Sequence, residues 1–193
     1  MQSPTLKNMH LQQQVGINYI LLTILAVAFT WLLHEFSHWL TGELLGNNMA
    51  MTLNSSYPLA GKYGAASHAN LVSIAGPLVT LLQAVIIYYL LKSGKAFLLF
   101  PFLLTCLYMR VMAAGLNFIN LNDEGRVSQS LQLGTFTLPL LISAILFYLV
   151  YAVVKQRQLS SRMIIITTLL VMFVSSIMIY PISFCISGYC KEV

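Results

Sequence analysis

Charged residues are scarce in this chain of 193 residues. Asp, Glu, Lys and Arg together make up 8% of the sequence, and apolar residues make up 58%. Soluble globular proteins average roughly 25% charged residues, so this composition excludes a soluble enzyme and a disordered tail. Cysteine is scarce as well, since three Cys residues are too few for a disulfide framework. The net charge of +5 is not gathered in a basic face, so the sequence predicts no nucleic-acid partner.

Long apolar runs dominate the rest of the chain. A helix needs roughly 20 residues to cross a bilayer. Five runs are long enough, at 17–42, 69–91, 96–117, 133–154 and 163–182. They predict an all-α, multi-pass integral membrane protein with about five transmembrane helices and the lipid bilayer as its partner. The expected organisation is a polar N-terminal segment, a single membrane domain and a short C-terminal tail, at residues 1–16, 17–185 and 186–193.

The connections between the runs carry two further signals. Residues 45–68 contain Gly, Pro and Asn breakers without a helical period, which predicts a short extended or hairpin segment between the first and second helices. With five spans, Lys and Arg residues favour the side of the N-terminus by two to one. The positive-inside rule then predicts a cytoplasmic N-terminus.

The first apolar run contains the pattern HExxH, formed by His34, Glu35 and His38. On a helix, positions i and i+4 share one face, so both imidazoles can bind the same ion. Glu35 adjoins the first ligand and can reach a water at the metal. This is the zinc metalloprotease motif. The alternative is a pair of interface histidines beside a snorkelling glutamate, which would leave three polar groups costly to bury.

A third metal ligand is expected because catalytic zinc has three protein ligands and an open position. Asp123 is the single Asp of the chain, and the topology places it on the same side of the membrane as the two histidines. Glu124 and His68 are expected on that side too and stay open as rivals. Asn122 or Asp123 could instead cap the next helix by accepting backbone N–H bonds.

Arg110 is another charge inside an apolar run, at about the depth of Glu35. Intramembrane charges are rare and usually functional. Arg110 could stabilise an oxyanion or pair with a carboxylate near the metal, and a structural role against backbone carbonyls or as a snorkelling residue is the favoured alternative. Asn117 and Asn120 are further candidates for substrate or oxyanion contacts. Cys185 and Cys190 could form a disulfide or stay free thiols.

Three motifs, in this order, resemble those of the site-2 protease family of intramembrane zinc metalloproteases. HEFSHWLTGELLGN looks like the HExxH helix of that family, and Ala-Gly-Pro at 75–77 looks like its second motif. NDEGR at 122–126 resembles its Leu-Asp-Gly-Gly motif, with Asp123 at the ligand position. Glu124 replaces the first Gly of that motif, and Thr80 stands where many members have Asn.

The resemblance implies a zinc metalloendopeptidase of a prokaryotic plasma (inner) membrane. It would hold one Zn²⁺ through His34, His38 and Asp123, with Glu35 as general base. Its substrate would be another membrane protein or membrane peptide, cut in or near a transmembrane segment, which segment 46–67 could bind as an added strand. A non-catalytic metal-binding membrane scaffold stays open as the alternative. A small transporter is disfavoured because the chain shows no internal repeat.

Overall fold

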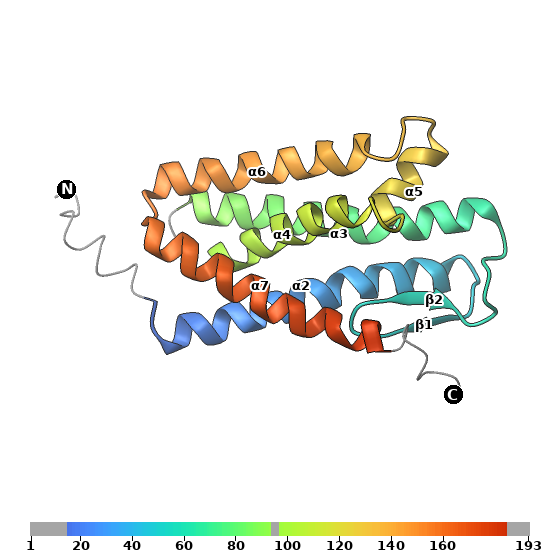
Figure 1. The fold of residues 1–193 in the computed structure, drawn as a ribbon, viewed down its shortest axis with the longest axis horizontal. Coiled ribbons are helices and arrows are strands. Elements are labelled where there is room, and N and C mark those ends of the chain that lie inside the picture. Colours follow the sequence, from blue (N-terminus) through green and yellow to red (C-terminus); the bar gives the residue numbers. More distant parts are fainter. Residues whose placement is uncertain (1–14, 94–96, 185–193) are drawn as a thin grey trace.

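The computed structural model describes residues 15–93 and 97–184, which form a helical bundle with one β-hairpin (Figure 1). Its elements, in chain order, are α2 (Ile17–Leu44), β1 (Met49–Met51), β2 (Ser56–Pro58), α3 (Ala66–Lys92), the 3₁₀ turn η1 (Phe97–Leu99), α4 (Phe100–Leu116), α5 (Asp123–Ser130), α6 (Thr137–Arg157) and α7 (Ser161–Phe184). The long helices run roughly along one axis. The hairpin and α5 lie at one end of it, and the turn between α6 and α7 lies at the other (Figure 1).

Four helices in the described part of the chain are long and apolar enough to cross a membrane, namely α2, α3, α6 and α7. This is consistent with an integral membrane protein. The predicted total of about five spans is not confirmed, because the run at 96–117 forms η1 and then the shorter α4 of 17 residues. At 1.5 Å per residue, α4 is about 25 Å long, short of the roughly 30 Å hydrocarbon core.

Helix α5 lies between the apolar runs 96–117 and 133–154, where the sequence predicts no helix. Asn122 occupies its N-cap position with extended backbone, but the Asn122 side chain makes no capping bond. Instead, the Asn122 side-chain amide donates to the carbonyl of Ala113, at 2.8 Å. Asp123 and Glu124 fill the first turn, where the helix dipole favours negative charge. Asn122 therefore stands at the N-cap position of α5, but the side-chain capping bond of the alternative interpretation is absent.

The apolar core lies at the end of the bundle that holds the α6–α7 turn. Its buried members come from several helices and include Leu91, Phe100, Leu103, Leu146 and Val153. The guanidinium of Arg157, near the end of α6, donates to the carbonyl of Leu91 at the end of α3. This packing fixes α3, α4 and α6 at one end, and the opposite end is left to polar groups.

The hairpin predicted between the first two spans is present. Strands β1 and β2 are antiparallel, with Ala50 opposite Tyr57. Three hydrogen bonds attach the hairpin to its surroundings. Two go to α2: the Met49 amide donates to the Glu43 carboxylate at 2.8 Å, and the Ser56 hydroxyl donates to the Glu35 carbonyl at 2.9 Å. The third goes to α7, where the Asn54 side-chain amide donates to the Met178 carbonyl at 2.8 Å. The hairpin is therefore held on α2 and α7.

Asn47 joins the two ends of the segment that carries the hairpin. Its side-chain nitrogen donates to the carbonyl of Gly42, and its side-chain oxygen accepts from the amide of Gly64 at 2.9 Å. The same nitrogen lies 3.3 Å from Nδ1 of His68, at the start of α3. One buried side chain thus ties the end of α2 to the approach to α3.

Asn47→Ala is expected to loosen the hairpin and leave the helices intact. The substitution leaves the Gly64 amide without its partner, at a cost of about 1–3 kcal/mol. Hydrogen exchange in detergent should then show the Gly64 amide exchanging roughly 5- to 150-fold faster. Asn48→Ala, at the exposed neighbouring position, is the matched control and should leave that rate unchanged. Equal rates in both variants would contradict this role of Asn47.

Candidate metal centre

The two histidines of the HExxH pattern lie one turn apart on the inward face of α2. Both are buried, with 4% of His34 and 5% of His38 exposed. Their Nε2 atoms are 3.1 Å apart, and their rings are perpendicular with centroids 4.6 Å apart. Both rings therefore present Nε2 to the same point, as the i, i+4 spacing predicted.

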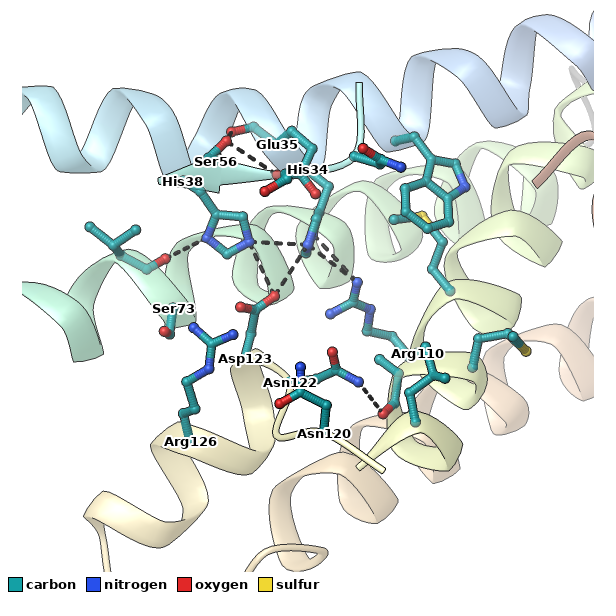
Figure 2. Close-up of a pocket in the computed structure, with 18 of the residues that line it drawn as sticks. His34, Glu35, His38, Ser56, Ser73, Arg110, Asn120, Asn122, Asp123 and Arg126 are labelled. Carbon is teal, nitrogen blue, oxygen red and sulfur yellow. Dashed lines mark hydrogen bonds and ion pairs between the residues drawn. The ribbon is translucent and has the colours of Figure 1, made fainter. Parts of the chain in front are cut away.

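Asp123, the first residue of α5, closes the group from the opposite side (Figure 2). Its Oδ2 lies 3.5 Å from Nε2 of His34 and 3.2 Å from Nε2 of His38. One donor atom from each of the three residues lies within 4.8 Å of the others. Burial raises the pKa of Asp123, but hydrogen bonds with the two histidines outweigh it and hold that pKa well below its usual range. The carboxylate is thus ionised, as a metal ligand must be.

The two rival ligands lie elsewhere. The ring of His68 lies beside Asn47, at the base of the hairpin segment. The carboxylate of Glu124 faces Arg110, with Oε1 2.6 Å from Nη1. Among the described residues, neither belongs to a group that could hold a metal ion. The structure thus favours Asp123 over both rivals.

The outer nitrogens of both histidines have partners, which fixes the orientation of the two rings. Nδ1 of His38 donates to the carbonyl of Val72 on α3, at 2.6 Å. Nδ1 of His34 lies 3.1 Å from the hydroxyl of Thr80, whose own proton goes to the carbonyl of Gly76 at 2.9 Å. The Thr80 oxygen is therefore free to accept from His34. Each ring is therefore held from outside through Nδ1 and turns Nε2 toward Asp123, where a metal would take the place of the Nε2 proton, the usual outer-shell arrangement of histidine ligands.

Gly76 lets α3 approach the two rings closely. A Cβ atom at this position would overlap the rings of both His34 and His38. The Ala-Gly-Pro sequence thus places the one residue without a side chain where the metal ligands need the space. Together with the inward-facing Nε2 atoms and the Asp123 carboxylate, this gives a donor set that could hold one metal ion.

Glu35 lies beside the donor set and is also buried, with 6% exposed. Its Oε2 lies 3.2 Å from the hydroxyl of Ser56 on β2, which shares its one proton between this oxygen and the backbone carbonyl of Glu35. Among the described residues, no Lys, Arg or His nitrogen lies within 4.0 Å of its carboxylate. The carboxylate is thus oriented by a neutral donor and not neutralised by a cation.

A cavity of about 380 Å³ opens onto the site. It is lined by all three candidate ligands and Glu35 (Figure 2). The other lining residues are Trp31, Asn54, Ser55, Ser56, Tyr63, Val72, Ser73, Met109, Arg110, Met112, Ala113, Leu116, Asn120, Asn122, Arg126 and Ile179. Its wall is therefore mixed, with apolar side chains from α4 facing polar ones from the hairpin and α5.

The three candidate contact residues lie in different surroundings. Arg110 and Asn120 line the cavity. Asn117 lies outside its lining, where its amide donates to the carbonyl of Ala113 and its oxygen accepts from the amide of Asn122. Asn117 thus shapes the turn into α5. Cys185, Cys190 and residues 1–14 lie outside the described part of the chain.

Arg110 has a carboxylate partner rather than backbone carbonyls. A carboxylate partner was one of the roles expected for Arg110, but Glu124 was not named as that partner. Thr80 and Ser56, which orient His34 and Glu35, were missed. One signal was available for Glu124, because a buried charge needs an opposite charge and the chain has only five acidic residues. Thr80 and Ser56 gave no such signal.

Comparison with known proteins finds no matching family model, no curated protein with significant similarity and no solved structure with a significant match. The chemistry of the site therefore has to be inferred from its own geometry.

Purified protein is expected to carry about one transition-metal ion per chain. Asp123→Ala should lose most of it, because two imidazoles alone leave the ion short of a ligand. His68→Ala is the matched control and should keep the metal, since His68 lies at the hairpin base. Elemental mass spectrometry on detergent-purified protein measures both the amount and the identity of the ion. Metal content indifferent to Asp123 would contradict the proposed ligand set.

Thr80→Val is expected to weaken metal binding roughly 10- to 100-fold, because His34 loses the partner that fixes the orientation of its ring. The measurement is competition with a chelator of known affinity. Thr105→Val is the matched control, since Thr105 is equally buried and bonds only the carbonyl of Pro101 within its own helix. Equal affinities for the two variants would rule out this role of Thr80.

Proposed function

We propose that the chain is an intramembrane zinc metalloendopeptidase that cuts a peptide bond in or near a transmembrane segment of another membrane protein. The observation that carries the proposal is the arrangement around the cavity. Two histidines and an aspartate converge there from α2 and α5, and a buried glutamate without a cationic partner stands beside them. Binding a metal ion needs the first three groups only. A hydrolase also needs the fourth.

Zinc is the proposed ion because two imidazoles and one carboxylate match the open three-ligand set of catalytic zinc sites. His34, His38 and Asp123 would hold it. When bound, zinc supplies Lewis-acid chemistry for water and for a carbonyl group. The resemblance of the three sequence motifs to site-2 proteases supports the same choice.

Glu35 is the proposed general base. Its carboxylate takes a proton from the attacking water and later gives it to the leaving amine. The Ser56 hydroxyl donates to one carboxylate oxygen, which sets its direction. The other oxygen is then available for the proton transfer.

The lining of the cavity supports a peptide from a membrane segment as substrate. Met109, Met112 and Leu116 on α4 offer an apolar wall for side chains that leave the bilayer. The hairpin offers polar groups opposite them, with Asn54, Ser55 and Ser56 in the wall. A two-stranded sheet has unpaired backbone groups along its outer edges, so an extended substrate could add to it as a strand.

Glu35→Gln is expected to keep the metal and to lower cleavage by about 10²–10⁴-fold, because the amide cannot accept the proton. The assay uses purified protein in detergent or liposomes with a panel of single-span substrates, and it counts the cleaved bonds by mass spectrometry. Glu43→Gln is the matched control on the same helix. Its carboxylate holds the hairpin amide of Met49, a bond that the Gln oxygen keeps.

Two results would contradict the proposal. Full cleavage by Glu35→Gln would remove the general base. A wild-type protein that carries zinc and cleaves no substrate of the panel would favour the alternative, a metal-binding membrane scaffold.

A further inference from the structure

Arg110 and Glu124 form a buried ion pair directly behind the metal site. Nη1 of Arg110 donates to Oε1 of Glu124 at 2.6 Å, and the two side chains are 4% and 3% exposed. Arg110 lies on α4, and Glu124 follows the candidate ligand Asp123 on α5. Taking two charges out of water is costly even when they are paired. The cost of burying this ion pair therefore suggests that it has a role in addition to holding α4 and α5 together.

The pair is asymmetric toward the cavity. Arg110 belongs to the cavity wall and Glu124 does not, so the carboxylate stands behind the guanidinium as seen from the site. Nη2 of Arg110 lies 3.5 Å from both Nδ1 and Nε2 of His34, against the ring that would bind the metal (Figure 2). Nε of Arg110 is buried and has no hydrogen-bond partner. Glu124 thus binds Nη1 through Oε1, its own Oε2 is unpaired like Nε of Arg110, and Nη2 stays beside the donor set.

An arginine with a purely structural role would have a different hydrogen-bonding pattern. Arginine carries five N–H donors, and a buried one is expected to have them satisfied. Here Nε is unpaired, and Nη2 has only long contacts with an imidazole. Donors left unpaired in a buried wall point to a ligand that brings the acceptor. Because arginine stays protonated in proteins, these nitrogens cannot lose their protons and always remain donors.

We propose that Arg110 is the oxyanion-binding residue of this site and that Glu124 is its positioning residue. The inference rests on the proposed function. As the water oxygen bonds to the carbonyl carbon, the π electrons of the C=O bond move onto its oxygen, and Glu35 takes the water proton. Arg110 donates hydrogen bonds to that oxygen without transferring a proton. The C–N bond then breaks, the C=O bond re-forms, and Glu35 protonates the amine.

The ion pair explains how Arg110 can serve as an oxyanion donor in a largely apolar cavity wall. Donors fixed before the reaction stabilise charge at the moment it develops, without reorganisation. Glu124 supplies that fixation through the 2.6 Å bond. Its negative charge also balances the guanidinium in the resting enzyme, so Arg110 does not need another anion before substrate arrives.

The test removes both members of the pair at once. Arg110→Met alone would leave Glu124 as an uncompensated buried charge, whereas replacing both partners of a buried pair with apolar residues is often neutral for folding. The variant is therefore R110M/E124L, and R110Q/E124Q is a second, polar version. Arg157→Met is the matched control for the loss of an arginine, since Arg157 holds a backbone carbonyl at the opposite end of the bundle.

We expect kcat of R110M/E124L to fall about 10²–10³-fold on the best substrate of the panel, with KM and zinc content close to wild type. A phosphinic peptide with the substrate sequence mimics the tetrahedral state. Its inhibition constant should rise in parallel with the loss in kcat/KM across the variants. A structural role would not produce that parallel. Arg157→Met should keep its kcat and its inhibition constant.

The outcomes separate this inference from the proposed function. A folded, zinc-loaded R110M/E124L that keeps kcat within about three-fold of wild type overturns the inference and leaves the protease standing. If that variant does not fold, the same threshold applies to R110Q/E124Q. A zinc-loaded wild type that cleaves nothing overturns the protease and this inference together.

Discussion

The structure around the candidate metal centre depends on one constraint: polar groups buried in an apolar bundle need hydrogen-bond partners. Water is absent from the hydrocarbon core of a bilayer, so a buried donor or acceptor there is costly unless it finds a partner within the protein. His38 finds the carbonyl of Val72, and His34 finds Thr80, whose hydroxyl is in turn satisfied within α3. These contacts require α2 and α3 to lie close together, which the missing side chain of Gly76 permits. The close packing of α2 against α3 and the orientation of the two histidines therefore depend on each other.

The sequence predicts local features of the site well, because spacing along one helix determines them. The shared face of His34 and His38 follows from four residues of separation, and the hairpin follows from breakers between two apolar runs. Asp123 could be predicted because it is the single Asp and because the topology returns the chain to the right side. The length of α4, the presence of α5 and the partner of Arg110 could not be predicted in this way. They depend on where α4 leaves the bundle, which is decided by contacts between segments distant in sequence.

Two departures from the resembled motifs occupy meaningful positions in the structure. Thr80 stands where many members of the site-2 protease family have Asn, and here its hydroxyl faces Nδ1 of His34. Glu124 replaces a Gly, and here its carboxylate faces Arg110. Both substitutions put a polar group where another polar group of this chain needs one. Both residues are thus part of the same buried network as the candidate ligands.

The charges around the cavity are compatible with a divalent ion in the proposed donor set. When ionised, Asp123, Glu35 and Glu124 carry three negative charges, and Arg110 supplies one positive charge among them, while the two histidines are neutral as metal ligands. Arg126, also in the cavity wall, is exposed, so water screens its charge. Two negative charges are then uncompensated in a largely buried site, which is unfavourable in a low dielectric. A divalent cation held by His34, His38 and Asp123 would cancel them. It would also let Glu35 stay ionised without a cationic side chain at hydrogen-bond distance, as a general base requires.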